Sequence, residues 1–413
     1  MQGGYYMEED KRIEKRLLSK GIMEYKIIRT ILRGMKYKEY FGSVSIEDLS
    51  DDKILVLFKT EEGIAKFTVS SFQSDNIIDR IIETSMKNQM KMSLQWHDDN
   101  FSDVKIEQNE NYNRFYKFNS NDYIMWIKKE IDNISKKIKF TFNTIYTINV
   151  NKYCLRTNKD YIEQYNTSSE FLCIENKTFK RRSKLSNRFL KDDIALSIIK
   201  QLNNDDIPRN NINLNSKQRI LLKAKGLSDF LNVYISLYYA NYIYSNQSFI
   251  KTNYIGKQIS KSNFDLIAIP YNGIKFDSEG SRIFKKLIVG SGKLINLLSN
   301  NSFSEYFNIN SFGNASLDTH NTVSHQRLIF TCKNSERIVS KSVDLIIHQF
   351  ENAYIDFEDN EVFRGNAICS DKSGYFRTTI SFNLKYIFNN IYPIGNKSTW
   401  INNVYCQDVI ILR

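Results

Sequence analysis

The sequence predicts an α+β protein with two regions. Residues 1–215 form an N-terminal α+β region of strands, helices and a central meander, and residues 216–413 form a C-terminal domain that is β-rich and largely antiparallel. Short β-type runs alternate with helix-period stretches in the first region, whereas the second consists mainly of short strand-like runs between turns. No repeat of fixed period is visible, which disfavours a solenoid or a propeller.

The composition indicates a folded protein of a reducing compartment. With 413 residues, 41% hydrophobic and 25% charged, the chain is long enough for roughly two to three domains. No apolar run approaches the roughly 20 residues of a membrane span, and the charged N-terminus lacks a signal-peptide core. The five cysteines are scattered without a CxxC pair, which disfavours a disulfide framework and a zinc ribbon: Cys154, Cys173, Cys332, Cys369 and Cys406. We therefore expect a soluble cytoplasmic protein.

The net charge of +12 invites a nucleic-acid hypothesis, but the sequence supports it weakly. Lys, Asn, Ile, Tyr and Phe are abundant and have AT-rich codons, so genome bias accounts for much of the excess lysine. The densest basic cluster, Lys180 to Lys184, holds only four cations. Charge alone predicts non-specific attraction, so nucleic acid is not the expected partner.

The first half contains recognisable strands and helices. A surface helix is expected over the first 20 residues, and strands over Lys53–Lys59 and Ile64–Ser70. Asp75 is placed as the N-cap of an amphipathic helix, and a second helix fits Ser120–Lys137. The polar stretch 98–113 resembles a linker.

A meander of antiparallel strands follows. Runs over 139–150, 161–165 and 170–175 are separated by polar stretches, of which Asn166-Thr167-Ser168 suits a hairpin turn. A helix is expected over Phe189–Leu202, and a polar break over 203–215 ends the region.

The clearest hairpin of the second half runs from Ile283 to Leu298 around the turn Gly290-Ser291-Gly292. Further strands are expected over 327–331, 353–357, 375–382 and 404–412. One helix is expected over Glu336–Phe350, and it would place His348 at the edge of the core.

Common catalytic motifs are missing. The chain has no GxGxxG, GxxxxGK[ST], GxSxG or HExxH. Its four histidines include His320 and His325, which are five residues apart. On a helix or a strand this spacing would point the two side chains in different directions, so they could not bind one metal ion. A loop that joins them to Cys332 remains a minor alternative for a metal site.

One acidic turn stands out because it precedes the strong hairpin. Asp277-Ser278-Glu279-Gly280 fits a tight turn with Gly280 at positive φ, and Gly313-Asn314 fits another turn. A carboxylate at such a turn can accept backbone N–H bonds, so we interpret Asp277 as architectural and not catalytic.

In sequence order these turns resemble a known family. The succession FDSEG, LIVGSGKL and SFGNA at residues 276–280, 287–294 and 311–315 is similar to the "DDEG, LIE-x-G-x-L, TGNA" series of the C-terminal domain in the TldD/PmbA (TldE) family. The closing "NL…VGN" element resembles Asn383-Leu384 through Gly395-Asn396, and Gly63 to Phe67 resembles an N-terminal strand of the family. The likeness spans residues from about 50 to the C-terminus. It implies the family's fold and makes Asp277, Glu279, Gly280, Gly313, Asn314, Gly395 and Asn396 a structural motif.

The sequence lacks the zinc-binding residues of the catalytic members of this family. Catalytic TldD-type members hold zinc with an HExxxH helix and a C-terminal cysteine. The corresponding stretch here, residues 220–229, contains no histidine and has Lys223 and Ser228 where ligands would be expected. The CGKxGQ motif is also absent, and Cys406 lies beyond its expected place, within a strand. The chain therefore resembles the PmbA/TldE branch, with no metal or catalytic residue expected in it.

Three functional hypotheses follow. The first is a non-catalytic subunit that forms a heterodimer with a TldD-like metalloprotease, in which zinc belongs to the partner, and that helps to hold an unfolded peptide for cleavage or maturation. When expressed alone, such a chain could form a homodimer. The second is a stand-alone metallopeptidase with atypical ligands, for example His320, His325 and Cys332. The third is a basic nucleic-acid or gyrase-associated protein.

Overall fold

The computed structural model describes residues 3–61, 63–70, 73–88, 120–137, 142–175, 181–187, 207–210, 212, 218–271, 274–311, 313–316, 322–333, 343–356, 358–359, 361–394, 397–401 and 403–412. Contacts divide the chain into two compact units, Met1–Asp206 (unit 1) and Ile207–Arg413 (unit 2). Each unit is described by itself.

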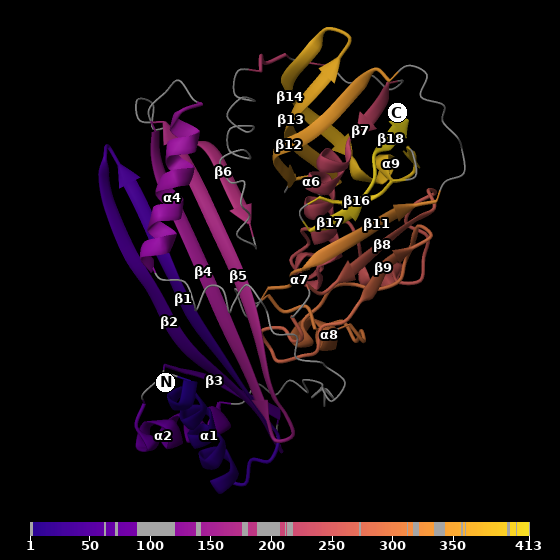
Figure 1. Cartoon of the computed structure of the whole chain (residues 1–413). Helices are drawn as coiled ribbons and strands as arrows, with labels where there is room; N and C mark the ends of the chain where they lie inside the picture. The colour runs from indigo at the N-terminus through magenta and orange to yellow at the C-terminus, as the bar shows by residue number, and fades with distance from the viewer. Residues whose placement is uncertain are drawn as a thin grey trace. The chain divides into compact units, whose positions relative to one another are not determined.

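Unit 1 is built on one antiparallel sheet of long strands (Figure 1). Its strand order is β3-β2-β1-β4-β5-β6. The strands are β1 Tyr25–Tyr40, β2 Ser43–Thr60, β3 Gly63–Ser70, β4 Phe142–Thr157, β5 Tyr161–Glu175 and β6 Arg181–Asn187. β1 and β2 form a continuous hairpin, which turns at Phe41 and Gly42 with positive φ at both residues.

Three helices of unit 1 are described. α1 (Gly3–Ser19) and α2 (Asp75–Lys87) pack Ile13, Leu17, Ile78 and Ile82 into one core with the strands. α4 (Ser120–Ser135) buries Ile127, Ile131 and Ile134, and its Trp126 ring lies 5.9 Å from that of Tyr146 on β4. In Figure 1, α1 and α2 lie at the β3 end of the sheet and α4 lies along β4.

Two local expectations for unit 1 were wrong. The α2 N-cap is Ser74, and Asp75 is the first helical residue, where its carboxylate pairs with Arg12 and Arg16 of α1. The turn expected at Asn166-Thr167-Ser168 is part of the continuous strand β5, because its residues pair with Asn151, Val150 and Asn149 of β4. The ladder to β4 outweighs the turn preference of this polar tripeptide. The expected linker 98–113 and helix 189–202 lie outside the described residues, as does most of 203–215.

Unit 2 contains two six-stranded sheets, ordered β10-β9-β8-β11-β17-β16 and β14-β13-β12-β7-β18-β15. Most pairs are antiparallel, and β7 with β12 and β11 with β17 are parallel. The first sheet comprises β8 Phe264–Ile269, β9 Lys286–Gly290, β10 Lys293–Leu294, β11 Arg327–Cys332, β16 Thr399–Ile401 and β17 Val404–Cys406. The second comprises β7 Arg219–Leu222, β12 Leu345–Ile355, β13 Val362–Asp371, β14 Gly374–Asn383, β15 Ile391–Pro393 and β18 Val409–Leu412.

The helices of unit 2 are α6 Ala224–Tyr234, α7 Ala240–Tyr244, α8 Asn301–Tyr306 and α9 Leu384–Ile387, with 3₁₀ turns at Ile235–Tyr238 and Thr252–Tyr254. The hairpin predicted around Gly290-Ser291-Gly292 is confirmed as β9–β10, and its turn has positive φ at Ser291 and Gly292.

The helix expected over Glu336–Phe350 was wrong. Residues 334–342 lie outside the described residues, and Leu345–Ile355 is the strand β12, so His348 lies on a strand. The apolar residues of this stretch also fit a helical period, but Leu345 and Ile347 are buried on one face by parallel pairing with β7 and antiparallel pairing with β13. Tertiary pairing of β-branched residues decides the structure here.

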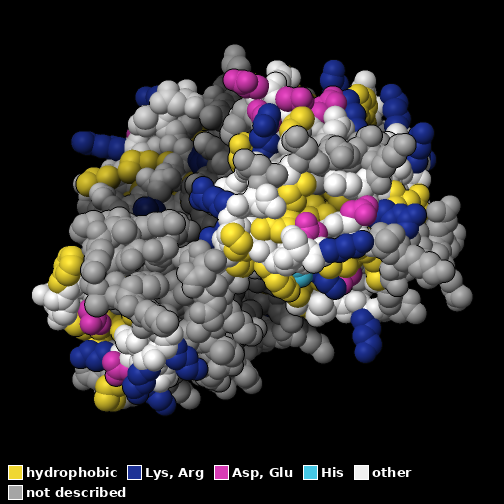
Figure 2. Space-filling model, turned by 90° about the horizontal axis from the view of Figure 1, so that it is seen from above, with side chains coloured by type: hydrophobic (Ala, Val, Ile, Leu, Met, Phe, Trp, Pro, Cys, Tyr) yellow, Lys and Arg dark blue, Asp and Glu magenta, His cyan; other side chains and the backbone are white. Residues whose placement is uncertain are grey.

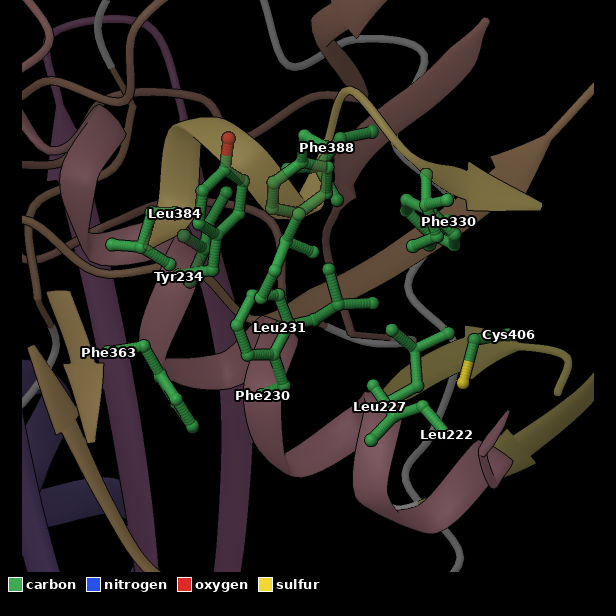
Figure 3. Close-up of a cluster of buried hydrophobic side chains, with 14 of the residues drawn as sticks. Leu222, Leu227, Phe230, Leu231, Tyr234, Phe330, Phe363, Leu384, Phe388 and Cys406 are labelled. Atoms are coloured by element: carbon green, nitrogen blue, oxygen red, sulfur yellow. The ribbon is translucent and has the colours of Figure 1, made fainter. Parts of the chain in front are cut away.

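The core of unit 2 surrounds α6. Leu227, Phe230, Leu231 and Tyr234 are buried, and in Figure 3 they lie among Phe330, Phe363, Leu384 and Phe388. The Phe230 ring lies 4.8 Å from Phe363, and Tyr234 stacks on Phe388 at 4.1 Å. The predicted α+β class is confirmed, with an α+β N-terminal unit and a sheet-rich C-terminal unit. Among the described helices, none is both long and apolar enough to cross a bilayer.

Unit 1 buries a charge cluster between α1 and the sheet. The Arg29 guanidinium of β1 is 2% exposed and binds both carboxylate oxygens of Asp52, at 2.9 and 2.6 Å. Asp10 and Glu9 of α1 each approach it to 3.5 Å. Burial raises the pKa of Asp10 to about 6, and the attraction of Arg29 and Arg156 only partly offsets this. The folded chain therefore binds a proton at Asp10 more tightly than the unfolded chain does.

We expect the variant Asp10→Asn to be more stable than the parent chain, by an amount that depends on pH. Because the folded-state pKa of Asp10 is raised from 3.8 to about 6, stability is lost as the pH rises from about 4 to about 6, and the loss is complete above that range. The variant should raise the free energy of unfolding by about 2–3 kcal/mol at pH 7.5 and change it little near pH 4. Urea denaturation at the two pH values measures this difference.

The matched control is Asp52→Asn, which weakens the bidentate pair of Arg29 and should destabilise the protein at pH 7.5. A loss of stability in Asp10→Asn at pH 7.5 would contradict the expected sign.

Candidate functional site

The candidate site lies at the N-terminus of α6, where β7 leads into the helix. β7 is buried between β12 and β18, and Lys223 follows it as the N-cap of α6. The helix can approach β12 closely because Gly226 has no side chain: a Cβ there would lie 3.2 Å from the carbonyl oxygen of Ile347. The first turn of α6 is thereby held against the sheet.

Both residues at the expected zinc-ligand positions are engaged within the chain. The Lys223 Nζ lies 2.9 Å from Asp408 Oδ2, and the other oxygen of Asp408 accepts the Ala224 N–H at 2.7 Å. Asp408 thus caps the positive end of the helix from a position 184 residues later. Ser228 is fully buried and donates its hydroxyl to the Ile401 carbonyl at 3.1 Å.

Cys406 lies beside the same turn. It ends β17, as its expected position within a strand requires, and its Sγ donates to the Ala224 carbonyl at 3.4 Å. Burial, followed by the charges of Asp408 and Asp229, raises the pKa of this thiol to about 12. Cys406 is therefore a neutral thiol at physiological pH, whereas a nucleophile or a metal ligand needs the thiolate.

Other titratable groups near α6 are also bonded internally. His348 Nε2 lies 2.8 Å from Ser370 Oγ, and its pKa is lowered by burial and by Lys223. Asp229 accepts the Phe350 N–H at 3.1 Å and pairs with Lys225. Burial raises the pKa of Asp229.

The donors at this site do not fit a zinc ion. Lys223 offers an ammonium group and Ser228 a buried hydroxyl. The nearby side chains of Cys406, Asp408, Asp229 and His348 are each bonded to another group of the chain and do not converge on one point, as zinc ligands must. Within the described part of the chain, no group of three or more His, Cys, Asp or Glu residues is placed to hold a metal.

The alternative ligand set is not assembled by the described residues. His325 precedes β11 and Cys332 ends it, so the strand between them spans about 16 Å, far beyond the size of a metal site. Cys332 is buried, and its thiol faces the Ile391 carbonyl at 3.6 Å. His320 lies outside the described residues.

His325 instead belongs to a polar junction that the sequence did not reveal. Its Nδ1 lies 2.5 Å from the Tyr239 hydroxyl, and its Nε2 lies 3.1 Å from both Asn232 Oδ1 and Asn403 Nδ2. Asn403 also donates to Asn232 at 2.8 Å. The junction joins α6 to the turn between β16 and β17, so this hairpin is bonded to the helix at Asn232 as well as at Ser228.

The family-motif residues form a separate buried turn. Asp277 is fully buried and accepts the N–H groups of Glu279 and Ser281 with one oxygen and that of Ala315 with the other, each at 2.9 Å. Glu279 accepts the Asn301 N–H at 2.9 Å. Gly280 has a φ of +66°, as the turn requires. These bonds tie the turn to the segment around Ala315 and to the start of α8.

The second turn of the motif depends on a close backbone approach. Gly313 has a φ of +80°, and a Cβ there would lie 2.3 Å from the Arg282 carbonyl oxygen. Asn314 bonds through Oδ1 to the buried Lys286 ammonium. Gly395 and Asn396 lie outside the described residues.

Lys286 is a buried titratable group within this turn region. Burial lowers its pKa to about 7, and the nearby charge of Asp277 only partly opposes this. The unfolded chain therefore binds the proton of this lysine more tightly than the folded chain does.

Asp277→Ala is expected to lower stability strongly. Three buried N–H groups lose their acceptor, and each unsatisfied group costs about 1–3 kcal/mol. Glu279→Ala loses one such bond and should cost less. Thermal melting of each variant measures the effect, and Asp371→Ala, in an exposed turn, is the control. Unchanged melting together with lost activity of an assembled complex would assign this turn to an active site.

Lys286→Met is expected to make the free energy of unfolding less dependent on pH. The lowered pKa of Lys286 makes the free energy of unfolding rise by about 1.4 kcal/mol per pH unit between pH 7 and 10. The variant should lack this slope and be more stable than the parent at pH 7. Denaturation over this pH range measures it, with the exposed Lys293→Met in the same hairpin as the control. Equal slopes for both variants would refute the neutral state of Lys286.

Comparisons with known proteins agree with this geometry. Residues 215–412 match the PmbA/TldA metallopeptidase C-terminal domain, and no curated protein matches the sequence. The fold is similar to that of a candidate modulator of a DNA gyrase from Thermotoga maritima, with a TM-score of 0.72 at 15% identity, over 98% of this chain and 99% of the other.

Two further solved structures share the fold. TldE from Thermococcus kodakarensis has a TM-score of 0.68 at 11% identity, and a candidate modulator of DNA gyrase from Bacteroides thetaiotaomicron has a TM-score of 0.71 at 11% identity. Each likeness covers 98% of both chains. Residues 215–412 thus match the C-terminal domain of the TldD/PmbA family in sequence, and the chain shares the fold of these solved structures over nearly its whole length.

Proposed function

We propose that this chain is a non-catalytic, TldE-like subunit that pairs with a TldD-like zinc metalloprotease in the proteolysis or maturation of peptides. One observation carries the proposal: Lys223 and Ser228, which stand at the zinc-ligand positions of the catalytic members, are bonded to Asp408 and to the Ile401 carbonyl.

Hydrolysis by a zinc enzyme needs an open coordination position and an activated water molecule. At the start of α6 a cationic ammonium group stands where a cation would have to bind, and the Cys406 thiol donates to the Ala224 carbonyl. In this proposal zinc belongs to the partner subunit, and this chain contributes no group to the reaction.

The role left to such a subunit is to shape the cleft and hold the peptide. β16 is the outermost described strand of one sheet of unit 2, and the Arg327 guanidinium stacks 3.8 Å above its Trp400. An extended peptide can add to such an edge through backbone bonds, which tolerate many sequences.

Both alternatives have less support. A stand-alone metallopeptidase with His325 and Cys332 as ligands requires side chains that β11 holds apart. A nucleic-acid function rests on the net charge of +12, but on the face shown in Figure 2 the Lys and Arg side chains are scattered and interspersed with acidic ones. An electrostatic footprint is expected as one patch or stripe.

The proposal predicts activity only in a mixture. This chain and TldD-like proteins of the same genome should co-purify, and peptidase activity should appear with the complex and disappear when the metal is chelated. Lys223→Ala should leave that activity largely intact, whereas substitution of a zinc ligand in the partner should abolish it.

Several outcomes would contradict the proposal. Peptidase activity of this chain alone at matching purity would identify it as an enzyme, and stoichiometric zinc lost on mutation of His320 or His325 would favour the atypical metallopeptidase. Salt-dependent DNA binding without any TldD-like partner would favour the nucleic-acid function.

A further inference from the structure

A buried amine and a buried carboxamide meet in unit 2. The Lys286 ammonium group donates to Asn314 Oδ1, and the two residues are only 5% and 7% exposed. They are 28 positions apart in the sequence, with Lys286 at the start of β9 and Asn314 directly after the turn residue Gly313. Neither residue has a part in the proposed function.

The backbones on both sides of this contact are held in place. Lys286 pairs with Ala268 of β8. The Asn314 N–H donates to the Ser299 carbonyl at 3.1 Å, and the Asn314 carbonyl accepts the Ser324 N–H at 2.9 Å. Well-oriented groups that a fold keeps in contact react at effective concentrations of about 10⁵–10⁸ M. The fold therefore presents one amine to one carboxamide.

The surroundings of Lys286 favour the nucleophilic form of its side chain. Burial lowers its pKa to about 7, so a large share of the molecules carries a neutral amine at physiological pH. The Phe284 ring centroid lies 5.2 Å from Nζ and adds apolar surface beside the amine. A desolvated, neutral lysine is the form in which proteins use this side chain as a nucleophile.

A buried carboxylate adjoins both groups. Asp277 is fully buried, and one of its oxygens accepts the N–H of Ala315, the residue after Asn314, at 2.9 Å. The charge of Asp277 also acts on Lys286. A carboxylate in this place can take a proton from one nitrogen and give it to another, as a general acid–base group does. Asp277 thus combines its architectural role with a place beside the two side chains.

We propose that Lys286 and Asn314 form an intramolecular isopeptide bond once the chain has folded. The Lys286 Nζ attacks the Asn314 Cγ, a new Nζ–Cγ bond forms, and the Cγ–Nδ2 bond breaks. One proton of the attacking amine passes through Asp277 to Nδ2, which leaves as ammonia. The reaction consumes no oxidant and no second substrate. The inference is independent of the proposed function.

The bond closes a loop that contains the β9–β10 hairpin and α8. A covalent loop restricts the unfolded chain, as a disulfide does, and thereby stabilises the fold. The pH dependence that we predict for Lys286 belongs to the unbonded chain, because the amide nitrogen of the bonded chain does not titrate.

The intact mass of the purified, denatured chain tests the bond. We expect the parent chain to be about 17 Da lighter than its sequence requires, because one ammonia is lost. Lys286→Met and Asn314→Ala should each have the full mass of their own sequence. Lys285→Met, at the exposed neighbouring lysine, is the matched control and should show the same deficit as the parent.

Peptide mapping identifies the bonded residues. A digest of the parent chain should contain one branched peptide that joins the segment of Lys286 to that of Asn314. Amine labelling of the denatured parent should modify Lys285 but not Lys286, whereas both lysines should be modified in Asn314→Ala. The mass and the branched peptide of the parent chain do not depend on how well any variant folds.

Two results would overturn the proposal. A parent chain with its full calculated mass would leave the pair as a hydrogen-bonded contact. A deficit of the same size that persists in Lys286→Met would show that the ammonia is lost when an asparagine closes a ring with its own backbone.

Discussion

The burial of α6 is the constraint on which unit 2 depends. Its apolar side chains contact residues of both sheets, from Phe330 on β11 to Phe363 on β13, so the helix cannot move without opening the core. The polar side of the helix is bonded as well, because the β16–β17 hairpin accepts from Ser228 and donates to Asn232. A helix held on every side gives the residues of its first turn little freedom to take up new roles.

The first turn shows how an ion pair can occupy the place of a metal site. The N-terminus of a helix attracts negative charge, and Asp408 meets that demand through the Ala224 N–H. Lys223 then balances the carboxylate at 2.9 Å, partly exposed to solvent. The pair adds little stability by itself at such exposure. The other carboxylate and the imidazole near this turn, those of Asp229 and His348, are also bonded within the chain.

Elements that depend on local interactions could be predicted from the sequence, whereas elements that depend on residues far apart in the sequence could not. α2, α4 and the β9–β10 hairpin were predictable because periodicity and turn residues are local signals. β12 and the middle of β5 were not, because pairing with β7 and β4 decides them. The same holds at the site. Lys223 and Ser228 were found by motif position, whereas Asp408 acts on the turn from 184 residues away and carries no local signal.

Buried charges in the two units illustrate opposite solutions to one problem. Arg29 of unit 1 remains charged because two oxygens of Asp52 and two further carboxylates surround it, and burial raises the pKa of Asp10 despite the attraction of Arg29. Lys286 of unit 2 lies beside the amide oxygen of Asn314, and the charge of Asp277 only partly opposes the effect of burial, so its pKa falls to about 7. Burial is the largest cause of both shifts, so neither shift needs a catalytic role to explain it.

Asp277 and the side chains at positions 223 and 228 differ in how strongly the fold depends on them. Asp277 holds three backbone N–H groups of two segments, so its replacement would damage folding directly. The side chains at positions 223 and 228 project from a helix whose packing depends on other residues, and a lysine and a serine can be accommodated there by new partners. The fold therefore constrains Asp277 more tightly than positions 223 and 228. Similarity of fold consequently transmits architecture but not activity, and the chemistry has to be inferred from the side chains at the start of α6.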